Sequence, residues 1–120
     1  MATELGRRRA AEYIATNYDH IPSALLAHQL RGAAACVDAG RMIEQGRRQG
    51  WPVDLDAIAC PLRFVWGTAD RLLPWPSAAA RFREALWQAD WIELEGIGHC
   101  PQLDVPTEAA ELILEFTTAR

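Results

Sequence analysis

Two side chains in the second half of the chain have the chemical types and the placement for acid–base catalysis. Asp70 follows residues 62–66, which have the composition of a buried strand, and His99 follows residues 91–95, where apolar and acidic residues alternate. Because the carboxyl ends of parallel strands meet at one edge of an α/β sheet, both residues are expected there. A carboxylate bound to one imidazole nitrogen orients the ring, so the other nitrogen can act as a general base. Asp70 and His99 are therefore predicted to form a catalytic pair.

Each residue also has an ordinary structural interpretation. An aspartate after a strand often forms a turn or caps a helix, and a histidine beside glycines is often held by structural hydrogen bonds. Gly96 and Gly98 would let the backbone that carries His99 pass close to neighbouring groups. The combination of an acid and a histidine at two strand ends favours the catalytic interpretation over either structural one.

The elements that must position this pair fall into two regions, residues 1–50 and 51–120. Helical periodicity over residues 3–18, and again after Pro22, predicts two or three helices in the first region, which ends at Gly50-Trp51-Pro52. The second region predicts an α/β pattern whose two parallel strands are joined by a right-handed crossover. Its order is strand, helix, strand, helix, over residues 62–66, 77–87, 91–95 and 107–116.

Residues 53–118 resemble the C-terminal half of the α/β-hydrolase-fold superfamily. The resemblance rests on two motifs, G-x-x-D-x-x-x-P and G-x-G-H-x-P, with further support on either side. The residues that carry it are Gly67, Asp70, Pro74, Gly96, Gly98, His99 and Pro101, supported by Leu55, Ile58, Cys60, Pro61, Asp104 and Pro106. It implies the C-terminal part of that fold: two parallel strands with flanking helices, preceded by lid-like helices over residues 1–50.

The resemblance also implies roles for individual residues. In that family the aspartate orients the histidine, and the histidine activates a serine, so Asp70 would be the triad acid and His99 the general base. Tyr18, Leu25 and Leu26 would lie in the lid-like region, where they either line a substrate pocket or pack between helices. The bond that is cleaved would be an ester, a C–C bond next to a carbonyl or a related bond.

The nucleophile that such a triad needs is not found in the sequence. Neither serine, Ser23 nor Ser77, lies in a G-x-S-x-G motif, and the side chain of Cys100 should diverge from that of its neighbour His99. We therefore expect a hydrolase fragment that is inactive by itself. Two alternatives stay open: a binding or interaction module that lacks catalysis, and a small α/β domain in which the pair binds metal. Two ligands make a poor metal site, which disfavours the last.

Composition limits the classes of binding partner and the cellular compartment that are expected. A net charge of −4 argues against nucleic acid or an anionic membrane as the main partner. The resemblance implies a small-molecule substrate for the full-length enzyme. The three cysteines are widely spaced, without zinc-site spacing, which indicates reduced thiols in a cytoplasmic protein. No apolar run has the length of a membrane span or of a signal peptide core, and nothing points to a cofactor.

Two strands make a marginal sheet, so we expect self-association through the uncovered edge of the first strand.

Overall fold

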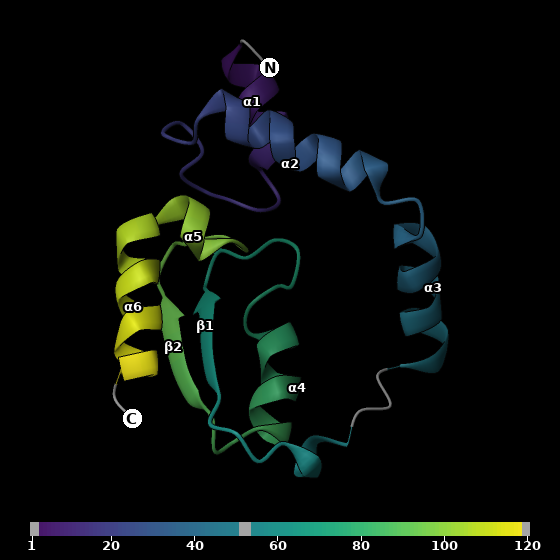
Figure 1. Ribbon diagram of the computed structural model, residues 1–120, viewed down its shortest axis with the longest axis vertical. Coiled ribbons are helices and arrows are strands. Elements are labelled where there is room, and N and C mark those ends of the chain that lie inside the picture. Colours follow the sequence, from purple (N-terminus) through teal and green to yellow (C-terminus); the bar gives the residue numbers. More distant parts are fainter. Residues whose placement is uncertain (1–2, 51–53, 119–120) are drawn as a thin grey trace.

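The computed structural model describes residues 3–50 and 54–118, which form a mixed α/β structure. Its first three helices run in order without a strand, and its second part alternates strands and helices (Figure 1). The elements are α1 (Glu4–Ala11), α2 (Ser23–Ala35), α3 (Ala39–Gln49), a 3-10 turn (Leu55–Ala57), β1 (Arg63–Gly67), α4 (Ser77–Ala85), β2 (Asp90–Leu94), α5 (Pro101–Asp104) and α6 (Pro106–Thr118). Trp51 and Pro52, where the sequence predicts a break, lie outside the described residues.

β1 and β2 pair in parallel, with Phe64 opposite Trp91 and Gly67 opposite Leu94. Alternate residues of a strand point to opposite sides of the sheet. Helix α4 packs on one side and α6 on the other. On one face Phe64 stacks on Trp91 and approaches Phe82 of α4. The two parallel strands therefore have flanking helices, as the sequence predicts.

On the opposite face, Arg63 anchors α6. Its guanidinium binds Asp90, the main-chain oxygen of Leu112 and the carboxylate of Glu115, and it lies 5.1 Å from the centre of the Phe116 ring. The hydrogen bond to Asp90 is the largest cause of the raised pKa of Arg63. The sequence suggests that this charged group reaches toward the surface, and its side chain is 14% exposed among these partners. It thus joins the sheet to the closing helix.

The main buried cluster lies outside the sheet, between the N-terminal region and α5. Its members are small or aliphatic side chains from α1, the loop after it, α2 and α5: Ala11, Ala15, Ile21, Leu26 and Leu103. Arg7 closes the loop by donating to the main-chain oxygens of Tyr18, Asp19 and Ile21. The N-terminal region is therefore packed directly against the part of the chain that follows His99.

Beyond this cluster, α2 and α3 extend away from the sheet and α3 lies on the far side of the structure from α6 (Figure 1). α3 has no buried residue, and Val37, Met42 and Ile43 are 92%, 65% and 64% exposed. The radius of gyration is 16.2 Å. A compact domain of this length would have about 14 Å. Leu26 is the one buried residue of α2.

Two differences between the predicted elements and the structure exceed a shift of one or two residues. The helix predicted over residues 3–18 ends at Ala11, because backbone groups farther along bind tertiary partners. Ile14 accepts a hydrogen bond from the Cys100 amide, and the Thr16 and Asn17 amides donate to Asp104. The second difference is α5, a short helix directly after Cys100 that the sequence pattern does not predict.

Candidate acid–histidine site

Asp70 and His99 lie together at the carboxyl edge of the sheet, as the strand pattern predicts. Oδ2 of Asp70 is 2.8 Å from Nδ1 of His99, and their side chains are 4% and 28% exposed. Because a carboxylate accepts and does not donate, Nδ1 carries the proton in this bond. Among the described residues Nε2 has no hydrogen-bond partner, which leaves it available to take a proton from another group.

The loop after β1 holds Asp70 in place. Its second oxygen, Oδ1, accepts the backbone N–H groups of Leu72 and Leu73, each at 2.8 Å. The Asp70 amide itself donates to the main-chain oxygen of Gly67 at 3.2 Å. One oxygen is thus fixed by the turn and the other faces the imidazole. The turn-forming role and the imidazole contact, treated as alternatives in the sequence, coexist in one side chain.

The loop that carries His99 packs tightly on the end of β1. The Ala69 amide donates to the Ile97 oxygen at 2.9 Å, and the Gly96 amide donates to Thr68 Oγ1 at 2.8 Å. Gly67 faces the main-chain oxygens of Ile97 and Gly98 so closely that a β-carbon would collide with both. Glycine at this strand end is therefore required for the two loops to meet. Gly96 adopts a φ of 72°, which favours glycine for a different reason.

A buried carboxylate that the sequence did not single out, Asp104, holds the other side of the same loop. It is 3% exposed, and it accepts the Gly98 amide at 2.7 Å. The same side chain accepts the amides of Thr16 and Asn17. In the sequence it appeared only as an acid between two prolines and as part of a family motif, and no local pattern reveals partners more than eighty residues away.

A cavity of about 210 Å³ opens beside the pair. β1 and the loops that carry Asp70 and His99 line it: Phe64, Val65, Trp66, Gly67, Asp70, Leu73 and His99. Trp66 is 8% exposed, and its Nε1 has no hydrogen-bond partner among the described residues. The cavity therefore brings apolar side chains of β1 and the acid–histidine pair into one lining.

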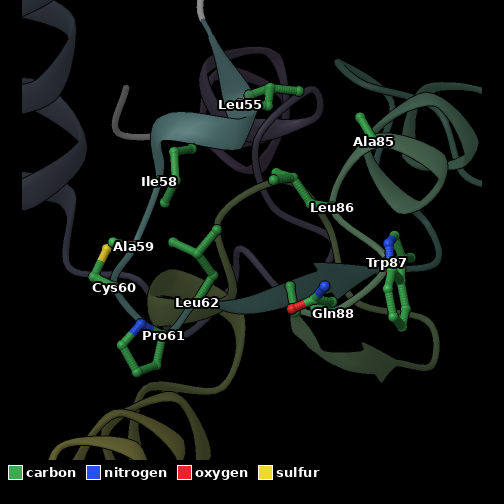
Figure 2. A pocket seen from close by; sticks show the side chains of 11 residues that line it. Leu55, Ile58, Ala59, Cys60, Pro61, Leu62, Ala85, Leu86, Trp87 and Gln88 are labelled. Carbon is green, nitrogen blue, oxygen red and sulfur yellow. The ribbon is translucent and has the colours of Figure 1, made fainter.

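A larger cavity, of about 420 Å³, lies at the opposite end of β1. Leu55, Ile58, Leu62 and Leu86 surround it, with Trp87 and Gln88 farther along the wall (Figure 2). Neither Asp70 nor His99 lines it. Its greater size therefore gives no reason to move the candidate site away from the acid–histidine pair.

Tyr18, Leu25 and Leu26 do not line the cavity beside the pair. Leu26 is 1% exposed and belongs to the buried cluster, against which Tyr18 packs. Leu25 is 39% exposed. Leu26 therefore packs between helices, whereas Tyr18 packs against the cluster and also lines a separate cavity of about 180 Å³.

The serines and the cysteine beside the histidine have other roles. Ser23 Oγ accepts a hydrogen bond from Arg7, and Ser77 Oγ donates to the Pro74 oxygen. Burial raises the pKa of the Cys100 thiol, and the charges of Asp104 and Asp70 raise it further. A raised pKa keeps the thiol protonated and a poor nucleophile. The described residues therefore bring together the acid and the histidine without a nucleophile bound to Nε2.

Two further properties of the described residues concern metal ions and membranes. No group of three histidine, cysteine or acidic side chains is arranged to hold a metal ion there. Within the same ranges, every helix is too short or too polar to cross a membrane.

Comparisons with known proteins give one structural likeness. No family model matches the chain, and no curated protein matches it. A solved structure described as a membrane phospholipase A, a novel bacterial virulence factor, superposes with a TM-score of 0.71 at 24% sequence identity. The match covers 93% of this chain, which spans 37% of the length of that protein. At this identity the likeness establishes the fold, and the matched protein is a hydrolase.

This result corrects the family assignment made from the sequence. The motifs around Asp70 and His99 resemble the C-terminal half of the α/β-hydrolase-fold superfamily, yet no family model supports that membership, and the structural likeness is to a membrane phospholipase A. The assignment is therefore wrong as a family identification. The mixed α/β class with two parallel strands is confirmed. The division into residues 1–50 and 51–120 and the catalytic roles of the pair stay predictions.

Proposed function

We propose that the chain carries the acid–base pair of a hydrolase that cleaves an ester or a related bond. The observation that carries this proposal is the 2.8 Å contact between Asp70 Oδ2 and His99 Nδ1. Asp70 is buried and fixed by two backbone amides, so it presents one oxygen to the ring in a defined direction. The likeness to a phospholipase, itself a hydrolase, supports the same reaction class.

In the proposed reaction, Nε2 of His99 takes the proton from a serine hydroxyl as the serine oxygen attacks the carbonyl carbon. Asp70 stabilises the imidazolium that forms and keeps the Nδ1 proton in place. The imidazolium then donates its Nε2 proton to the leaving oxygen, and the acyl group remains on the serine. Water, deprotonated by the same nitrogen, releases the acid and restores the serine. Asp70 does not leave its hydrogen bond at any step.

The serine of this proposal comes from polypeptide outside the described residues. Ser23 and Ser77 are engaged with Arg7 and with the Pro74 oxygen, and the Cys100 thiol is held protonated. The chain spans 37% of the length of the matched phospholipase, which is compatible with a site that another polypeptide segment completes. By itself the 120-residue chain is then expected to show no His99-dependent turnover of activated esters.

The test uses the protein isolated under native conditions from its own cells, together with whatever polypeptide accompanies it. Hydrolysis of p-nitrophenyl esters and of phospholipid is compared for the unchanged protein, His99→Ala and His28→Ala. His28 is exposed on α2, so its replacement is a matched control. We expect His99→Ala to lower the rate by about a hundredfold or more, as loss of a general base does. Equal rates for the two variants, or no hydrolysis at all, would overturn the proposal.

The alternative, a binding module without chemistry, is favoured by one observation. α3 exposes apolar side chains such as Met42 and Ile43, and nothing in the described part of the chain covers them. If the natively isolated protein contains a tightly bound partner and hydrolyses no ester, this alternative replaces the hydrolase proposal.

A further inference from the structure

We propose that Asp104 is a positioning residue that fixes the backbone next to His99. This inference rests on the proposed role of His99 as the base, but its geometry is independent of any turnover. Asp104 lies at the end of α5 and is 3% exposed, and it does not contact the imidazole. Its effect on the base would therefore act through the main chain.

Both oxygens of Asp104 are used. Oδ1 accepts the amides of Thr16 at 2.8 Å and Asn17 at 2.7 Å. Oδ2 accepts the Gly98 amide at 2.7 Å and lies 3.0 Å from the Thr16 amide and 3.1 Å from Thr16 Oγ1. A carboxylate has about four acceptor sites and no donor, which matches this set of N–H and O–H groups. An asparagine would place its own N–H₂ against one of them.

Two backbone hydrogen bonds, one of them to Asp104, hold the chain on either side of His99. The Gly98 amide, one residue before His99, is held by Asp104, and the Cys100 amide, one residue after it, donates to the Ile14 oxygen at 2.7 Å. A β-carbon on Gly98 would lie 3.0 Å from both Ala15 Cα and Asp104 Oδ2, so the loop has little room to shift. The peptides on both sides of His99 are therefore tied to the segment that follows α1.

This arrangement makes the N-terminal region part of the support of the site. Thr16 Oγ1 has two acceptors, the Gly96 oxygen at 3.0 Å and Asp104 Oδ2 at 3.1 Å. His20 Nε2 approaches the Leu103 oxygen at 2.7 Å, which adds a second contact between the same loop and α5. Removal of the Asp104 carboxylate would release Gly98 and Thr16 at once, while β1 and β2 keep their own pairing.

The test is nuclear magnetic resonance of the ¹⁵N-labelled 120-residue chain. One readout is the exchange of the His99 Nδ1 proton with water, which reports the bond to Asp70. The other is exchange of the β1 and β2 amides, which reports general stability. We expect Asp104→Asn to speed the Nδ1 exchange by about tenfold or more, as loss of charged hydrogen bonds implies. Strand-amide exchange should change much less, and Glu108→Gln, on the exposed side of α6, should change neither.

A second pair of variants decides the matter if Asp104→Asn does not fold. Thr16→Val removes the hydroxyl that faces Asp104, and Thr16→Ser keeps it. Faster Nδ1 exchange in Thr16→Val than in Thr16→Ser supports the proposal. A folded Asp104→Asn with unchanged Nδ1 exchange overturns it, and so does an equal rate for the two Thr16 variants when Asp104→Asn is unfolded. Neither result depends on ester hydrolysis, so this proposal can fail while the hydrolase proposal stands.

Discussion

Gly67, the last residue of β1, faces the main-chain oxygen of Ile97 with no space for a side chain between them. The contact brings the end of one strand against the loop that follows the other. Asp70 and His99 extend from these two segments, and their hydrogen bond joins the same two segments. Backbone packing, as well as the two side chains, therefore builds the site.

Replacement of Gly67 by alanine should destabilise the protein. The new β-carbon would collide with the Ile97 and Gly98 oxygens, and overpacking of this kind costs about 1–3 kcal/mol. Gly32→Ala is the matched control, because a β-carbon there meets no atom within 4 Å and the site lies within α2. Alanine in a helix is favoured over glycine by about 1 kcal/mol. The midpoint of urea unfolding should fall for Gly67→Ala and rise for Gly32→Ala. Equal midpoints for the two variants would show that the close approach is absent.

Alkylation should distinguish Cys100 from the two exposed cysteines. Since its pKa is raised, the thiolate of Cys100 forms only at a higher pH than that of an ordinary thiol, and the thiolate is the species that reacts. We expect iodoacetamide to label Cys100 more slowly than Cys36 and Cys60 at pH 7.5, with the difference shrinking as the pH rises. Peptide mass spectrometry gives the three rates. Fastest labelling at Cys100 would indicate an activated thiol and restore it as a candidate nucleophile.

The edge of β1 should support self-association of the 120-residue chain. Within the described residues the sheet has two strands, so β1 has β2 on one side and an unpaired edge on the other. Unpaired edges invite strand pairing between molecules, and a lysine on an edge strand opposes it. Sedimentation should show association that increases with concentration and that Val65→Lys reduces. The control is Glu95→Lys, an exposed position after β2. A monomer at all concentrations, or equal effects of the two lysines, would contradict this expectation.

Much of the second half of the chain follows from local sequence. Strand composition before Gly67 and alternation before Gly96 place β1 and β2 within a residue of their observed bounds. The carboxyl ends of paired parallel strands necessarily share an edge, which is why Asp70 and His99 were predicted together.

The first half shows where such reasoning fails. Thr16 and Asn17 continue a helical pattern, yet their amides bind Asp104, which no periodicity within the helix could indicate. The apolar stripe of α2 predicts burial, but the described chain supplies a partner for Leu26 and not for Leu30. Tertiary partners, rather than propensity, decide both cases.

A double-mutant cycle on ester hydrolysis by the natively isolated protein tests most directly whether Asp70 and His99 act as one unit. Asp70→Asn keeps the size of the side chain but removes the carboxylate that orients Nδ1–H, and we expect it to lower kcat by roughly 10²–10⁴. In the His99→Ala background, the same change should lower kcat by no more than about threefold, since residues that act together lose their effects together. Losses that multiply in the double variant would contradict the acid–histidine pair as the catalytic unit.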